Sequence, residues 1–232
     1  MKTILRVFVL LALGAAVLHA ASDPEQLHKA ANVLSEIMRT PDRGIPDDLL
    51  RKSVCVGVVP SQLKAAFIFG GTYGRGVLIC RAHGNGPWGA PSMFALGGAS
   101  FGFQIGGEAT DVVFLVMNPE GAKKLLQDDV KLGGDVSAAA GPVGRTLESA
   151  TDAQLHAEIL SYSRARGLFA GVSLEGAVLK QDSDANRRLY HQKVTARDIL
   201  IRGSVATPPE AWPIDRLLTK HAPHGGAPFR ES

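Results

Sequence analysis

Arginine and lysine are the residue types in this sequence best suited to binding a ligand, because both attract anions and a guanidinium group donates paired hydrogen bonds to phosphate or carboxylate oxygens. Near an anionic surface each such charge contributes about 1 kcal/mol of binding free energy. Four of them converging on one face would hold phosphate-bearing headgroups without any catalytic group, whereas dispersed charges would form no site. The candidates for such a face are Arg43, Arg51, Lys52, Lys64, Arg75, Arg81, Arg145, Arg164 and Arg166.

Two patterns touch on catalysis or phosphate binding, and both are weak. Ser161, His156 and Asp152 are the residue types of a hydrolase triad, but no nucleophile-elbow motif surrounds the serine. The glycine-rich run at 70–76 could cradle a phosphate with backbone N–H groups. It lacks the lysine-serine ending and the following helix of a phosphate loop, so a structural role for these glycines is favoured.

Metal-binding patterns are also incomplete. Residues 182–186 match the first ligand positions of a calcium loop, but Arg187 and Lys193 stand where Gly and Glu are needed. His221 and His224 have metal-like spacing without a third ligand. The sequence therefore predicts a protein that is not an enzyme and that uses neither a metal nor a cofactor.

The stretch at 94–117 organises the predicted fold. Read as a strand, it places large apolar side chains on one face and mostly glycines on the other. Glycine inside a strand often marks a tight bend or the close approach of another element. The stretches at 67–79 and 166–179 combine glycines and apolar residues in the same way. They predict an α+β fold with a strongly curved, mostly antiparallel, Gly-rich sheet, either open or barrel-like, packed with N-terminal and central helices.

The N-terminal helix of the domain is expected at residues 23–39. Asp23 is its expected cap and Pro24 suits its first position. Its apolar positions follow helical spacing. Because Lys29 and Arg39 are balanced by two glutamates, packing on the core is favoured over lying in a membrane interface. The apolar positions are Leu27, Ala30, Ala31, Leu34, Ile37 and Met38.

Other elements are predicted from capping and breaking residues. A strand at 54–59 is expected to end at Pro60, and a central helix is expected at 118–131. Residues 180–189 read as a polar turn region. Short helices are expected at 195–200 and 214–219, and Trp88 is expected to close one end of a core.

The N-terminus has the pattern of a secretory signal peptide. Lys2 and Arg6 precede an apolar segment at 7–18, and small residues follow at 20–22. We therefore expect residues 1–21 to be removed, residues 22–220 to form one domain and residues 221–232 to be a flexible tail. The expected location is the periplasm or outside the cell, and an uncleaved N-terminal anchor is the alternative.

Removal of this peptide changes the charge of the chain. The chain has 25 Lys and Arg against 22 Asp and Glu, a net charge of +3. Loss of Lys2 and Arg6 lowers it to +1. Nucleic-acid binding needs a strongly basic face, which this balance does not indicate.

Cys55 and Cys80 are the only cysteines. Outside the cytoplasm they could form a disulfide. As free thiols they would be two small buried side chains. The sequence leaves both readings open.

Several motifs together resemble the SYLF domain family, in its bacterial branch. The resemblance covers residues 24–218, and its strongest parts are the glycine-rich segments. The matching residues are Ile45-Pro46, Val58-Val59-Pro60, Phe69-Gly70-Gly71, Trp88, Ala90-Pro91, Gly97-Gly98-Ala99-Ser100-Phe101-Gly102, Gln104-Ile105-Gly106-Gly107, Gly141-Pro142-Val143-Gly144-Arg145 and Arg166-Gly167-Leu168-Phe169-Ala170-Gly171.

The resemblance implies a module that binds phospholipids. Eukaryotic members of the family are similar in binding phosphoinositides, in part through an N-terminal amphipathic helix, and some bind actin. The expected function is therefore an exported, non-catalytic domain that recognises anionic lipid headgroups or a membrane surface through the basic residues named above. The alternative is a structural or protein-interaction domain of the cell envelope without lipid specificity.

Overall fold

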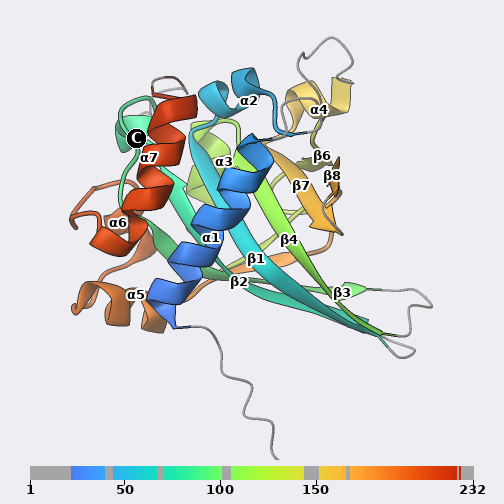
Figure 1. The fold of residues 1–232 in the computed structure, drawn as a ribbon, viewed down its shortest axis with the longest axis horizontal. Coiled ribbons are helices and arrows are strands. Elements are labelled where there is room, and N and C mark those ends of the chain that lie inside the picture. The colour runs from blue at the N-terminus through green and yellow to red at the C-terminus, as the bar shows by residue number, and fades with distance from the viewer. Residues whose placement is uncertain are drawn as a thin grey trace, which may run out of the picture.

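The computed structural model describes residues 22–39, 44–66, 70–100, 106–143, 152–165, 168–223 and 225. These residues form an α+β fold in which one strongly curled sheet makes a half-barrel (Figure 1). The predicted fold class is confirmed.

The sheet has nine strands in the order β5-β9-β3-β2-β1-β4-β7-β6, with β8 also pairing to β7. Every pair is antiparallel except β6 with β7, which is parallel. The strands are β1 (Cys55–Ala66), β2 (Gly70–Cys80), β3 (Ser92–Ser100), β4 (Gly106–Val116), β5 (Asp129–Lys131), β6 (Ala138–Ala140), β7 (Ile159–Ala165), β8 (Leu168–Gly171) and β9 (Val178–Gln181).

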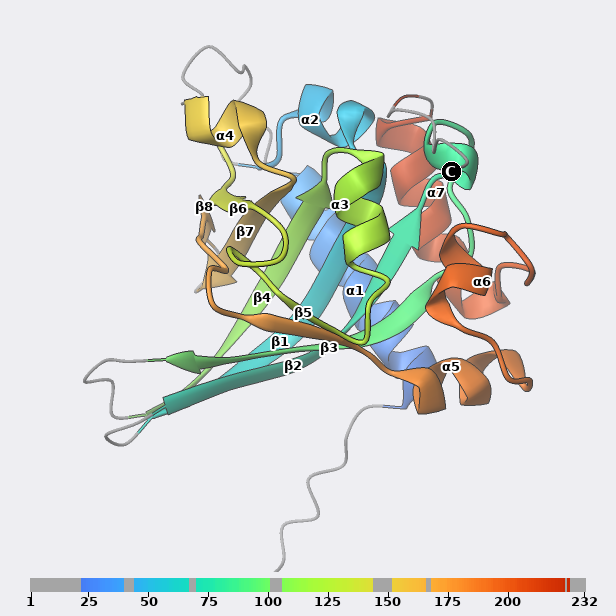
Figure 2. The same ribbon diagram turned by 180° about the vertical axis from the view of Figure 1, so that it is seen from behind.

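The helices lie on both sides of this sheet. Helices α1 and α7 cover one face (Figure 1), and α3 lies on the opposite face, around which the sheet curls (Figure 2). The helices are α1 (Asp23–Met38), α2 (Asp47–Lys52), α3 (Pro119–Lys124), α4 (Asp152–His156), α5 (Ser183–Tyr190), α6 (Ala196–Leu200) and α7 (Trp212–His221), with 3₁₀ turns η1 (Ala82–Gly84) and η2 (Pro209–Ala211).

Two hydrophobic cores follow from the alternation of side chains along the strands. The outer core lies between the sheet and α1 and α7, and it includes Leu34 and Val58. The inner core lies on the opposite face and includes Val59, Phe114 and Leu179. Val58 and Val59 are both fully buried, so β1 is covered on both faces.

Helix α1 packs on the outer core, as its charge pattern predicted. Leu27, Leu34 and Ile37 are at most 1% exposed, so its apolar face is not available to a membrane interface. Its cap is Ser22, one residue earlier than expected, whose Oγ accepts a hydrogen bond from the backbone N–H of Glu25 at 3.4 Å. Among the helices that the structure describes, none is long and apolar enough to cross a bilayer.

The glycines allow the close approaches that the sequence indicated. Gly57 lies directly opposite Phe114 on the neighbouring strand β4, and a Cβ at Gly57 would overlap the Phe114 ring. A Cβ at Gly171 would likewise overlap the backbone carbonyl of Gly141. These glycines bring neighbouring elements of the curled sheet into contact.

Three predicted element boundaries are wrong. Strand β1 does not end at Pro60, because a register shift between Val59 and Gln62 accommodates the proline and lets pairing resume. The central helix ends at Lys124, and residues 129–131 instead pair with β9 as strand β5. Residues 180–189, read as a turn, lie in β9 and α5.

Arg81 and Trp88 hold the C-terminal part of the chain. The Arg81 guanidinium is fully buried, stacks 4.0 Å from the centre of the Trp88 ring and donates a 2.9 Å hydrogen bond to the Ala222 carbonyl. Trp88 Nε1 donates to the same carbonyl at 3.0 Å. Trp88 thus closes the end of a core, as predicted, and Ala222, just beyond the expected domain boundary, is buried.

Candidate functional site

Four of the nine basic residues proposed for a phosphate-binding face have no described side chain. Arg43, Arg145 and Arg166 lie outside the described residues, and Lys64 lies in β1 with its side chain outside the described part. The side chains of Arg51, Lys52, Arg75, Arg81 and Arg164 are described. Arg81 is buried within the fold and cannot reach a ligand at the surface.

Arg75 connects the beginnings of α1 and α5. Its Nη2 lies 2.5 Å from Asp23 Oδ1, and its Nε lies 3.2 Å from Asp182 Oδ2. Arg188 donates to Asp23 as well, from Nε at 2.7 Å. Burial raises the pKa of Asp23, but the hydrogen bonds from Arg188 and Arg75 outweigh it, so the pKa lies below its usual value. The charge of Arg75 is therefore largely neutralised inside the fold.

Arg164 is held in a similar way near the other end of α1. It pairs with Glu36 of α1, and its Nη2 lies 2.8 Å from Asp111 Oδ2. Its guanidinium also lies 5.8 Å from the centre of the Phe169 ring. Asp111 in turn accepts the backbone N–H of Ser61 at 2.9 Å. Arg164 thus ties α1 to the bend in β1.

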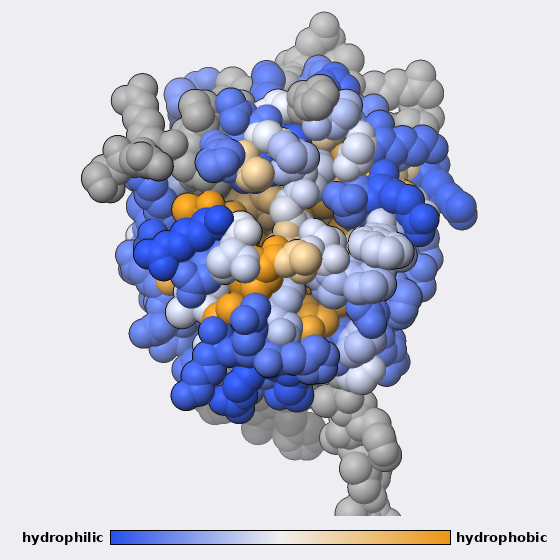
Figure 3. All heavy atoms as spheres, turned by 90° about the vertical axis from the view of Figure 1, so that its left-hand side faces the viewer, coloured by the Kyte–Doolittle hydropathy of each residue, from blue (hydrophilic) through white to orange (hydrophobic). Residues whose placement is uncertain are grey.

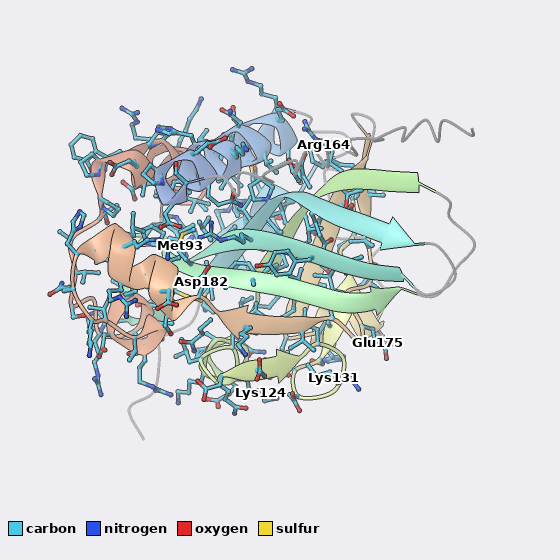
Figure 4. All side chains as sticks on the ribbon, turned by 90° about the horizontal axis from the view of Figure 1, so that it is seen from below. Met93, Lys124, Lys131, Arg164, Glu175 and Asp182 are labelled. Atoms are coloured by element: carbon cyan, nitrogen blue, oxygen red, sulfur yellow. A yellow bond between two sulfur atoms is a disulfide. The ribbon has the colours of Figure 1, made fainter. Side chains whose placement is uncertain are left out.

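Two of the placed residues, Arg75 and Arg164, lie far apart. Arg75 and Arg164 contact Asp23 and Glu36, which are 13 positions apart on α1. That separation corresponds to roughly 20 Å along the helix axis. Figure 4 shows Asp182 and Arg164 in different parts of the molecule. Arg51 is exposed on α2 beside Asp48. A single headgroup could not contact Arg75 and Arg164 together.

The weak catalytic patterns gain no support from the geometry. Ser161 is fully buried, and its Oγ lies 2.8 Å from the Val172 carbonyl and 3.2 Å from the Ala139 carbonyl. His156 and Asp152 are exposed on α4. The part of the chain that the structure describes holds no group of three or more His, Cys, Asp or Glu able to bind a metal.

The glycine-rich run and the calcium-like loop are also structural. Residues 70–76 lie in β2, paired with β1 and β3. Asp182 caps α5 by accepting the backbone N–H of Ala185 at 2.9 Å. Neither segment has the conformation of the ligand loop that its sequence resembles.

The structure contains a groove that the sequence did not indicate. It is bordered by the beginning of α1, the end of α5 and the segment before α7, and its volume is about 750 Å³. Figure 3 looks onto the side of the molecule with α5, α6 and α7, where apolar atoms lie in the middle and hydrophilic residues surround them. We call this the α5 groove; its lining includes Pro24, Arg188, Leu189, Tyr190, Val205 and Pro208.

Two side chains give the α5 groove its chemistry. The Arg188 side chain is 56% exposed, and its Nε and Nη2 donate to Asp23. Tyr190 Oη donates to the Pro91 carbonyl, and burial raises the Tyr190 pKa. Beyond the groove, Trp212 at the beginning of α7 is 53% exposed. The groove therefore joins an apolar floor to a guanidinium on its rim.

The residues next to the α5 groove carry a concentration of positive charge. Residues 183–202 contain five Arg and Lys against two Asp, a net charge of +3. All five basic side chains are exposed. We call them the α5–α6 basic segment: Arg187, Arg188, Lys193, Arg197 and Arg202. The prediction of a turn at residues 180–189 does not place this segment on helices, although the local charge count alone indicates it.

Comparisons with known proteins identify the family. Residues 97–221 match the family model described as "Ysc84: Las17-binding protein actin regulator". The chain is 37% identical over 202 residues to LAS seventeen-binding protein 3 of Saccharomyces cerevisiae, covering 84% of this chain and 43% of the relative. It is 34% identical over 196 residues to SH3 domain-containing YSC84-like protein 1 of Homo sapiens, covering 82% and 56%.

The chain spans about half the length of the curated relatives it matches. A third relative, an SH3 domain-containing protein of Schizosaccharomyces pombe, is 40% identical over 200 residues, covering 84% of this chain and 43% of the relative. Each of these three matches covers more than four fifths of the chain. The chain belongs to the Ysc84 family of SYLF domains.

Proposed function

We propose that this chain is an exported, non-catalytic domain that binds anionic phospholipid headgroups, and that the α5–α6 basic segment together with the α5 groove makes the contact. The observation that carries the proposal is the concentration of five exposed basic side chains beside a groove with an apolar floor. The mature chain has a net charge of +1 and this segment one of +3, so the rest of the mature chain carries a net charge of −2.

The chemistry of the groove suits an amphiphilic ligand. A phospholipid presents an anionic phosphate next to apolar chains. Arg188 uses its Nε and Nη2 for Asp23, and its Nη1 donates to no acceptor in the described part of the chain. A guanidinium has five N–H donors, so Arg188 keeps donors for a phosphate oxygen while staying fixed by Asp23. Leu189 and Val205 supply the apolar contact.

The exposure of Trp212 supports contact with a membrane surface. Tryptophan is enriched at membrane–water interfaces because one part of the ring is apolar and the N–H group is polar. Trp212 follows directly after η2, whose Pro209 and Glu210 line the α5 groove. A lipid surface that meets the groove would therefore also meet Trp212.

Export is supported by two independent features. The N-terminal residues have the charge and hydrophobicity of a signal peptide, although they lie outside the described part of the chain. Cys55 and Cys80 form a disulfide in the structure. Structural disulfides persist in oxidising compartments such as the periplasm or the extracellular space.

Vesicle co-sedimentation tests the proposal. The mature protein is mixed with neutral phosphatidylcholine vesicles or with vesicles that also contain phosphatidylglycerol. The variant Lys193→Ala/Arg197→Ala removes two charges from the α5–α6 basic segment, and Arg51→Ala/Lys52→Ala removes two exposed charges from α2 as the matched control. At about 1 kcal/mol per charge, the first variant should bind anionic vesicles at least tenfold more weakly.

The two variants separate a defined site from general attraction. We expect binding only to anionic vesicles, reduced by salt and by the α5–α6 variant, with little change in the α2 control. Equal losses in both variants would show that net charge, and not this segment, is responsible. Absence of binding to any vesicle would refute the lipid proposal.

A protein partner is the second candidate, because the yeast relative is named a LAS seventeen-binding protein. The α5 groove, with its apolar floor, could equally hold a protein segment. In that case the domain would act in the envelope without lipid specificity. Binding of an envelope protein that survives loss of lipid binding, and that is abolished by substitutions in the groove, would favour this reading.

A further inference from the structure

A second cavity lies on the face of the sheet opposite α1, next to the inner core. Its volume is about 150 Å³. It is formed where the apolar side chains of the inner core give way to polar ones, and Val112 and Leu174 belong both to that core and to the cavity wall. We call it the inner cavity; its polar lining includes Gln62, Thr72, Thr110, Ser163, Ser173 and Glu175.

One buried polar atom in the wall of the inner cavity has no hydrogen-bond partner among the residues that the structure describes. Thr110 is 2% exposed, and its Oγ1 makes no hydrogen bond. Gln62, which is 4% exposed, lies directly opposite Thr110 on β1 and β4 and also lines the cavity. Buried polar groups almost always have partners, so an unpaired hydroxyl group facing a cavity indicates a ligand that supplies one.

The bend in β1 is what turns Gln62 toward the cavity. In a regular strand Gln62 would share the face of Val58, which lies in the outer core. The register shift between Val59 and Gln62 reverses the alternation and turns Gln62 to the inner face. Ser61, within this bulge, has a φ of 52° and donates its backbone N–H to Asp111 Oδ1 at 2.9 Å. The side chain of Gln62 is therefore aimed by a specific backbone feature that α1 supports through the Arg164–Asp111 pair.

The lining defines the class of ligand. The cavity walls offer hydroxyl groups and one amide, which both donate and accept hydrogen bonds. Among the lining residues that the structure describes, Glu175 alone has a charged side chain, and its exposed carboxylate disfavours an anion. A volume of 150 Å³ equals that of about five water molecules, which limits the ligand to a few non-hydrogen atoms.

We propose that the inner cavity binds a small hydroxylated molecule without negative charge, of the polyol or amino-alcohol class, through Thr110 and Gln62. This site is separate from the α5 groove, and it shares no lining residue with it. Binding in the inner cavity does not depend on phospholipid binding, so each of the two binding proposals can be tested without the other.

Amide-resolved NMR titration of the mature protein tests the proposal. The probes are glycerol, which is neutral, ethanolamine, which is a cation, and glycolate, which carries a hydroxyl group and a carboxylate. We expect glycerol and ethanolamine to shift backbone signals around Gln62, Thr110, Ser163 and the segment 173–177, and glycolate to bind at least tenfold more weakly. Shifts spread over the surface, or equal shifts with glycolate, would overturn the proposal.

Variants at position 110 identify the group responsible. Thr110→Val keeps the side-chain shape and removes the hydroxyl, and it should weaken binding at least tenfold. Thr110→Ser keeps the hydroxyl and should retain binding, which controls for disturbance of β4. Equal binding by the wild type and Thr110→Val would refute the assignment. A response to no probe, with only ordered water on Thr110 Oγ1 in a high-resolution structure, would also refute it.

Discussion

Loss of the Cys55–Cys80 disulfide should destabilise this domain measurably. The two cysteines lie directly opposite each other on β1 and β2 and are separated by 25 positions in the sequence. Both are almost fully buried in the inner core. In the chain-entropy model, a loop of this length restricts the unfolded chain by an amount equal to about 3.5 kcal/mol of stability at 25 °C. For a domain of this size each kcal/mol corresponds to about 2–4 °C in Tm.

The double variant Cys55→Ala/Cys80→Ala should therefore unfold about 7–14 °C below the wild type. Thermal unfolding followed by circular dichroism measures the difference. Reductant should lower the Tm of the wild type by a similar amount and leave the double variant unchanged. Two free thiols in the mass spectrum of the protein purified without reductant would refute the reasoning, as would a Tm shift below about 2 °C.

Two further changes test the packing of α1 and of the sheet. Asp23→Asn removes the negative charge that Arg75 and Arg188 share and one of the two acceptor oxygens. It should lower the free energy of unfolding in urea by about 1–2 kcal/mol, less than for a fully buried pair because Arg188 is half-exposed. The pKa of Asp23 is lowered in the folded state. The difference in free energy of unfolding between the variant and the wild type should therefore be constant above about pH 5 and shrink below pH 4. A difference that grows in acid would contradict the assignment. Gly57→Ala should lower the free energy of unfolding by about 2–3 kcal/mol, because the added Cβ overlaps the Phe114 ring. Adding Phe114→Leu to this variant should restore part of the lost stability. A Gly57→Ala variant as stable as the wild type would refute the close packing.

The parts of the fold predicted correctly are those specified by local sequence. Helix α1 could be predicted from the spacing of Leu27, Leu34 and Ile37, because a helix buries one face whatever it packs against. The curled sheet could be predicted from its glycines, because their missing side chains allow close approach. Helix α6 was expected from Thr195, and its side chain does accept the backbone N–H of Asp198 at 3.1 Å.

The errors arise where contacts distant in sequence override local signals. Pro60 usually ends a strand, but in β1 it falls at a bulge between two long neighbouring strands. Helix α5 is short and charged, and its anchor is Asn186, whose Oδ1 accepts the backbone N–H of Met93 at 2.7 Å across 93 positions. No local pattern reveals such a contact.

The ion pairs made by two of the predicted site residues could not be foreseen for the same reason. Arg75 and Arg164 could be recognised as suitable for phosphate, but not as partners of Asp23 and Asp111, which lie more than 50 positions away. These pairings hold the fold together and use the charges that a ligand would need. The α5 groove depends on three segments brought together by folding, so its shape could not be predicted from spacing.

The fluorescence of Trp212 gives the most direct test of the central proposal, because this exposed tryptophan lies next to the α5 groove and the other, Trp88, is buried. The mature protein is titrated with phosphatidylglycerol vesicles whose acyl chains carry bromine, a short-range quencher, and Trp212→Phe serves as the control. We predict quenching and a blue shift in the wild type that salt reverses and that the Trp212→Phe variant lacks. Binding to the vesicles without any change in Trp212 emission would place the contact elsewhere and contradict the account.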